Sequence, residues 1–106
     1  MTPAQRYSEL ASKMKRSPGV TDLSEGKGYG SSGQLKVDGR IFAMLVRDEL
    51  VLKLPRSRVD ELVAAGDGTN FDAGKGRPMR EWFVLSSRSK QEWLPLAKEA
   101  LAFVRG

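Results

Sequence analysis

Residues 35–55 read LKVDGRIFAMLVRDELVLKLP and hold the densest apolar content of the chain. Asp38-Gly39 interrupts this stretch as a hairpin signal, because a type I′ turn needs a positive φ at two successive positions and Asp-Gly tolerates it. Arg47-Asp48-Glu49 is a second polar interruption, which separates Ile41–Val46 from Leu50–Leu54. The stretch therefore predicts three antiparallel strands joined by two tight turns.

The two turns set the expected register of these strands. A two-residue loop at Asp38-Gly39 places Leu35 opposite Phe42, and one at Asp48-Glu49 places Val46 opposite Val51. One face of these strands has only apolar side chains, and we expect the helices to pack against it. It carries Ile41, Ala43, Leu45, Leu50, Leu52 and Leu54. The second face is also apolar, so we expect a further strand, a loop or a partner to cover part of it. It carries Leu35, Val37, Phe42, Met44, Val46 and Val51, with Arg40 and Lys53 among them.

Helical patterns lie on both sides of this stretch. Residues 2–16 begin with a Thr N-cap, a Pro at the first helical position and a Gln in the capping-box position. Residues 56–65 predict a second helix that ends before a glycine. Residues 89–104 predict a third, with a second capping box at its start and the clearest helical stripe of the chain. Pro95 either kinks this third helix or marks its start.

Residues 80–85, REWFVL, predict a fourth strand, with Trp82 and Val84 on one face and Phe83 and Leu85 on the other. The predicted order is therefore α-β-β-β-α-β-α over a single domain, residues 1–106. The economical arrangement for this order is an α+β fold of two layers, a single antiparallel sheet with helices mainly on one face.

Composition narrows the function classes. The chain of 106 residues has no cysteine and no histidine, which excludes disulfides and argues against a structural zinc site. Without histidine the usual general base near neutral pH is missing, so we expect no enzymatic activity, no cofactor and no metal. No apolar run approaches the roughly 20 residues of a membrane span. The first residues, MTPAQRYSELASK, lack the apolar core of a secretory signal, so we expect a cytoplasmic protein.

A net charge of +5, spread along the chain, leaves an anionic partner open as an alternative. Residues 28–33 match G-x-G-x-x-G, but a strand follows where a dinucleotide site needs a helix, so we interpret them as a connection. Residues 66–79 form the longest irregular stretch. It is either an anion-binding loop or an ordered surface loop. The candidate anion or nucleic-acid contacts are Lys53, Arg56, Arg58, Lys75, Arg77 and Arg80.

Three segments are the most distinctive for comparison with known families: KVDGRIFAML, LVLKLPRSRVDEL and FDAGKGRPMREW. Over about residues 17–105 the chain resembles the TfoX/Sxy N-terminal-domain family and the related MmcQ/YjbR-like proteins. The resemblance implies a two-layer α+β fold like that of type III secretion chaperones. It also implies regulation, since TfoX/Sxy proteins regulate natural competence and act with the cAMP receptor protein. MmcQ/YjbR members are often labelled DNA-binding.

The leading hypothesis is a small non-enzymatic regulatory or adaptor domain that acts through protein contact, in transcription or competence as the resemblance implies. One alternative is a direct DNA-binding module that uses a basic surface. Another is a binder of small anionic ligands at the glycine-rich loop 66–79. The apolar second face also suggests a weak symmetric dimer, which Arg40 and Lys53 would oppose by repelling their symmetry mates, so monomer and weak homodimer both stay open.

Overall fold

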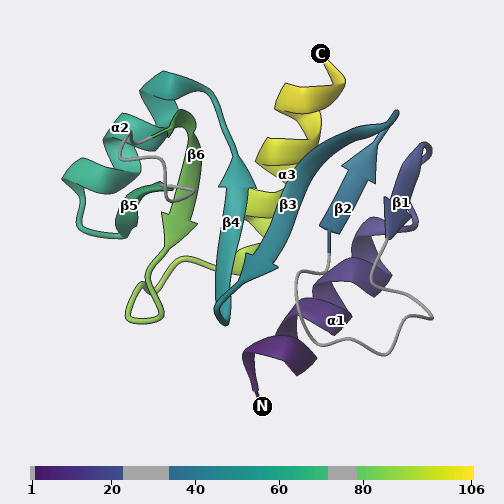
Figure 1. Cartoon of the computed structure of the whole chain (residues 1–106), viewed down its shortest axis with the longest axis horizontal. Coiled ribbons are helices and arrows are strands. Elements are labelled where there is room, and N and C mark those ends of the chain that lie inside the picture. The colour runs from purple at the N-terminus through teal and green to yellow at the C-terminus, as the bar shows by residue number, and fades with distance from the viewer. Residues whose placement is uncertain (1, 23–33, 72–78) are drawn as a thin grey trace.

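The computed structural model describes residues 2–22, 34–71 and 79–106. They form three helices and six strands (Figure 1). The helices are α1 (Pro3–Met14), α2 (Arg56–Ala64) and α3 (Trp93–Arg105). The strands are β1 (Val20–Asp22), β2 (Gln34–Val37), β3 (Arg40–Val46), β4 (Glu49–Lys53), β5 (Gly68–Phe71) and β6 (Met79–Leu85).

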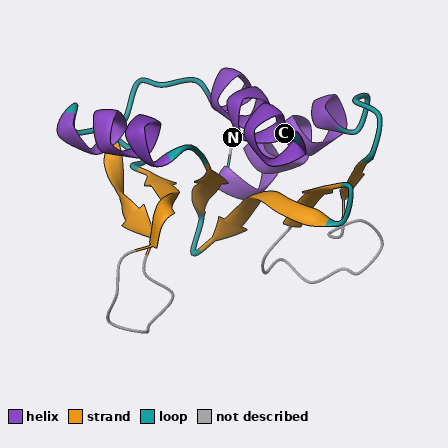
Figure 2. Cartoon of the chain, turned by 90° about the horizontal axis from the view of Figure 1, so that it is seen from above, coloured by secondary structure: helices purple, strands orange, loops and turns teal. Residues whose placement is uncertain are grey.

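All six strands belong to one antiparallel sheet in the order β1-β2-β3-β4-β6-β5. Figure 2 views this sheet from its edge and shows the three helices on the same side of it. Helix α3 packs on β3 and β4, and α2 packs on β5 and β6. The predicted α+β class and the antiparallel sheet are confirmed. Two short edge strands, β1 and β5, were not predicted, since they lie in stretches that we expected to be irregular.

The hydrophobic core lies between the sheet and the helices. The helices contribute buried residues at helical spacing, which in α3 run from Leu96 to Val104. The sheet contributes Leu35, Val37, Phe42, Ala43, Leu45, Leu50, Leu52, Leu54, Phe83 and Leu85, all within the same core cluster. No charged side chain is buried among the described residues, so this core is held mainly by apolar contact, with a buried hydrogen bond that the Tyr7 hydroxyl donates to the Ala43 carbonyl at 3.4 Å.

The first hairpin has the predicted turn but not the predicted register. Asp38 and Gly39 have φ values of 51° and 84°, as a type I′ turn requires, and Val37 pairs with Arg40. The register then shifts, so that Leu35 lies opposite Ala43 and not opposite Phe42. Phe42 is therefore an extra residue in β3, which is the definition of a β-bulge.

The bulge corrects our assignment of the two faces. Leu35, Val37 and Phe42, which we expected on the second face, are fully buried in the core with the helices. Ile41, which we expected in the core, is only half-buried and lies outside the core cluster. An extra residue exchanges the faces of what precedes it in the strand, because side chains alternate with a period of two.

The second hairpin turns at Arg47-Asp48, with φ values of 51° and 66°, one residue earlier than predicted. Val46 consequently pairs with Glu49 and Leu45 with Leu50, a register that differs from the predicted one by two positions. A shift of two positions leaves every side chain on its face. The prediction that Leu45, Leu50 and Leu52 face the helices is therefore confirmed.

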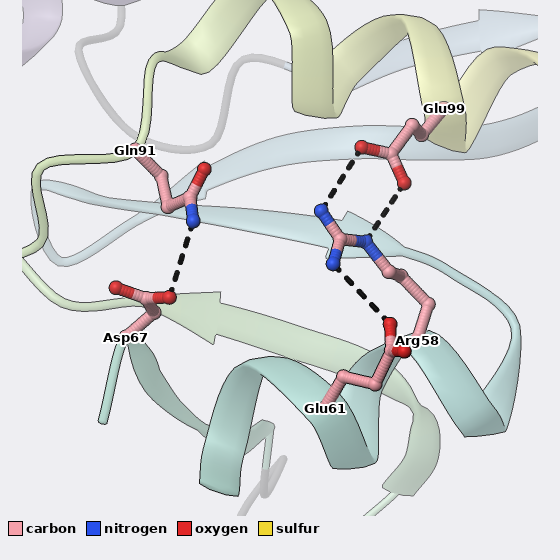
Figure 3. Close-up of polar contacts among 5 residues, drawn as sticks. All are labelled: Arg58, Glu61, Asp67, Gln91 and Glu99. Atoms are coloured by element: carbon pink, nitrogen blue, oxygen red, sulfur yellow. Dashed lines mark hydrogen bonds and ion pairs between the residues drawn. The ribbon is translucent and has the colours of Figure 1, made fainter. Parts of the chain in front are cut away.

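The predicted capping box of α1 is present, since Gln5 N donates to Thr2 Oγ1 at 3.1 Å and Thr2 N donates to Gln5 Oε1 at 2.9 Å. The capping box predicted at Ser89 is wrong, because α3 begins at Trp93. Ser89 Oγ instead donates to Asp67 Oδ1 at 2.9 Å, and Gln91 also contacts Asp67 (Figure 3). Pro95 lies in the first turn of α3, where its missing N–H is tolerated.

Replacement of Leu52 and of Met44 by alanine tests which face carries the helices. Leu52 is fully buried in the core, whereas Met44 is half-buried on the other face. We expect Leu52→Ala to lower the free energy of unfolding by about 2–5 kcal/mol, and Met44→Ala to lower it by less than half as much, as measured by urea denaturation. Equal losses would contradict the placement of the helices.

Gly68→Ala tests the packing of β5 on β6. A Cβ atom at Gly68 would overlap the backbone oxygen of Val84 and approach the Phe83 ring to 2.6 Å, so β5 would have to shift. We expect a loss of about 1–3 kcal/mol from overpacking. Thr69→Ala is the control, because Thr69 is exposed on the same strand and should lose less than about 1 kcal/mol. An equal or smaller loss for Gly68→Ala than for Thr69→Ala would show that β5 is loosely attached.

Candidate binding surface

The side of the sheet opposite the helices, which we call the open face, carries a continuous row of apolar side chains. Strand register aligns Met44 with Val51, Val51 with Val84, and Val84 with Thr69. Val51 is fully buried yet lies outside the core cluster. Figure 2 shows no helix on this side of the described sheet.

One end of the row forms a hollow of about 340 Å³, which we call the apolar groove. Val46, Val51 and Val84 line it, together with Thr69 and Phe71 of β5 and with Arg47 and Glu49 from the β3–β4 hairpin. The groove therefore combines a valine floor with one charge of each sign.

A further hollow lies where the bulge separates β3 from β4, and it is lined from both sides of the sheet, since α3 lies on the helix side and Arg40 pairs with the core residue Val37. The β3–β4 ladder ends where Ala43 pairs with Leu52, so β3 separates from β4 on the N-terminal side of Ala43. The separation leaves a hollow of about 500 Å³. Its lining includes Lys36, Arg40, Ile41, Lys53 and Trp82, and the last turns of α3 contribute Phe103 and Val104.

Another hollow, of about 380 Å³, adjoins the hollow of about 500 Å³. It is lined by Lys53, Arg56, Arg80, Glu81 and Trp82. Lys53 and Trp82 line both spaces, and we call the two together the basic hollows. They hold five cations and a single carboxylate, that of Glu81.

Lys53 and Trp82 are cross-strand partners between β4 and β6. The Lys53 Nζ atom lies 5.4 Å from the centre of the Trp82 ring, within the range of a cation–π contact. Trp82 is half-buried and lies outside the core cluster. The pairing of β4 with β6 therefore places the Trp82 indole ring beside the positive charge of Lys53, where the two hollows meet.

The structure brings together Lys53, Arg56 and Arg80 of the six predicted contact residues. Arg58 points elsewhere, because its Nε donates to Glu99 Oε1 at 2.9 Å and its Nη1 lies 3.3 Å from Glu61 (Figure 3). The hydrogen bond to Glu99 is the main reason that the pKa of Arg58 is raised. Lys75 and Arg77 lie outside the described residues, as do residues 28–33 and most of the loop 66–79.

Sequence reasoning placed Arg40 on the second face with Lys53, but it named neither Lys36 nor Arg40 as a candidate contact, and it placed Trp82 on one face of a strand without assigning it to a binding surface. Alternation in REWFVL does separate Trp82 from Phe83, but both are aromatic, so the pattern alone does not say which of them faces solvent. Arg40 follows the hairpin turn, and its direction depends on the bulge. The sequence did carry one signal for this surface: cations lie at both ends of residues 35–55, Lys36 and Arg40 at one end and Lys53 and Arg56 at the other.

The described residues contain no cluster of three or more Asp, Glu, His or Cys side chains that would hold a metal ion. No helix within the described ranges is long and apolar enough to cross a membrane. What the open face and its margin do offer is apolar area, one half-buried indole and several cations. These are groups that bind ligands.

No family model, curated protein or solved structure matches the chain. The resemblance to the TfoX/Sxy family therefore stays a prediction. Function has to be argued from the geometry of the open face.

Substitution of Arg58 and of Arg56 by methionine compares an arginine that stabilises the fold with one that lies at a surface hollow. Arg58→Met removes the contacts that tie α2 to Glu99 of α3, so we expect a loss of about 1 kcal/mol in the free energy of unfolding. Added salt should reduce this loss by screening. Arg56→Met should change stability by less than about 0.5 kcal/mol. An equal effect of the two substitutions in urea denaturation would contradict this assignment.

Proposed function

We propose that this chain is a small cytoplasmic regulatory or adaptor domain, without catalytic activity, that binds a protein partner at the apolar groove. The observation that carries the proposal is the second apolar face of the sheet, where the half-buried Met44, Val46 and Val84 surround the fully buried Val51. A contiguous apolar patch on the outside of a small domain marks an interaction site.

The chemistry of the partner follows from the lining of the groove. Valine side chains and the Phe71 ring suit an apolar segment, and Arg47 and Glu49 at the rim would fix its orientation through charge pairs. The resemblance to TfoX/Sxy proteins, which act with the cAMP receptor protein, favours a transcription regulator as the source of that segment.

A second copy of this chain fits the open face less well than another protein does. Two-fold pairing through the open face would bring two sets of Lys36 and Lys53 into one interface. Like charges placed close together at an interface oppose association. We therefore propose a heterologous partner, and a homodimer is an outcome that the experiment must be able to report.

Site-specific photocrosslinking in the host cell tests the proposal. A benzoylphenylalanine at position 69 lies on the open face, since Thr69 is exposed and lines the groove. The control position is 64, because Ala64 is exposed on α2, on the helix side. We expect one discrete light-dependent adduct from position 69 and none from position 64.

The complex should then re-form from the purified chain and the protein identified in the adduct, and Val84→Lys should weaken it at least about tenfold by placing a charge on the apolar row. Circular dichroism and the thermal midpoint would confirm that the variant is folded. An adduct that contains only two copies of this chain, or the absence of any adduct from position 69, would refute the proposal.

A further inference from the structure

Trp82 is a large aromatic side chain that lies outside the hydrophobic core cluster. It stands on a central strand of the sheet, half-buried, and lines a hollow on each side of the Lys53–Trp82 pair. Exposed aromatic rings on an open antiparallel sheet are the groups on which unpaired bases stack. The ring therefore offers a stacking surface that an apolar core residue does not.

Positive charge collects around this ring. Lys36, Arg40 and Lys53 line the larger hollow, and Arg56 and Arg80 join Lys53 in the smaller one. The net charge of the whole chain is +5, and its excess looks diffuse along the sequence. In the fold it is concentrated, because five cations and one carboxylate share these two spaces.

The two hollows differ in a way that matches the two parts of a nucleotide. The larger has apolar walls from Ile41 and Phe103 next to the Trp82 ring, which suits the flat face of a base. The smaller is dominated by Arg56 and Arg80, which suit phosphate oxygens. Volumes of about 500 and 380 Å³ lie within the range of small-molecule sites, roughly 300–1,000 Å³.

We propose that the basic hollows bind single-stranded nucleic acid, with a base stacked against Trp82 and the neighbouring phosphates held by Lys53, Arg56 and Arg80. A duplex keeps its bases stacked on one another, so it would leave the indole ring and its apolar walls unused. A peptide of acidic residues alone, such as polyglutamate, would pair with the cations but has no flat ring to stack on Trp82. The proposal is independent of the protein site, which lies in the apolar groove.

Fluorescence anisotropy of a labelled 12-nucleotide oligo-dT and oligo-U measures the binding. We expect dissociation constants in the micromolar range near physiological salt, with an affinity that falls as salt rises. Trp82→Leu should weaken binding about tenfold or more, whereas Trp82→Phe should keep most of it, because stacking needs a ring.

The cations have a matched control. The double variant Arg56→Gln/Arg80→Gln should weaken binding at least about tenfold and lower the salt slope by about two phosphate contacts. Arg16→Gln/Arg88→Gln removes the same charge from exposed positions outside both hollows and should leave the affinity almost unchanged. Equal losses in the two double variants would overturn the proposal, since binding would then follow net charge alone.

Stacking has its own readout. The chain has two tryptophans, so Trp93→Phe leaves Trp82 as the sole indole, and its fluorescence should be quenched on addition of the unlabelled oligonucleotide. This measurement keeps the proposal testable if Trp82→Leu fails to fold. Unchanged fluorescence at saturation would overturn it. So would displacement of the single strand by an equal or lower concentration of duplex DNA or of polyglutamate.

Discussion

The extra residue in β3 is the constraint on which the functional surface depends. Lys36 pairs with Ile41 and Leu35 with Ala43, so Phe42 has no partner in β2 and its ring fills the core. On the N-terminal side of Ala43 the strand no longer pairs with β4. One insertion therefore places Phe42 in the core and opens a space between β3 and β4, as bulges near binding sites do.

The polar contacts of the described fold gather on the helix side and at its margins. Arg58 joins α2 to Glu99 of α3, and Arg105 Nη2 donates to the carbonyl oxygen of Pro18 at 2.6 Å. Asp67 holds the segment before α3 through Ser89 and Gln91. Among the described contacts, the one that involves a cation of the basic hollows is the cation–π contact of Lys53 with Trp82.

The sequence predicted the structure best where a local pattern is compatible with a single conformation. The Asp-Gly turn, the capping box at Thr2 and the stripe of α3 each follow from local chemistry. The bulge escaped prediction because IFAML is apolar in both phases, so an extra residue leaves no trace in the alternation. Strands β1 and β5, with sequences VTD and GTNF, are too short for a period to show. Arg56 and Arg58 look equivalent in sequence, and only the packing of α2 near Glu99 separates their roles.

The two outermost strands have a consequence for how this molecule combines with others. Strand β1 has three residues and β5 has four, and edges this short present few unpaired backbone groups to an incoming strand. The described edges therefore offer little to an incoming strand, which protects against edge-to-edge aggregation. A partner at the proposed groove would pack on the face of the sheet and would not extend it.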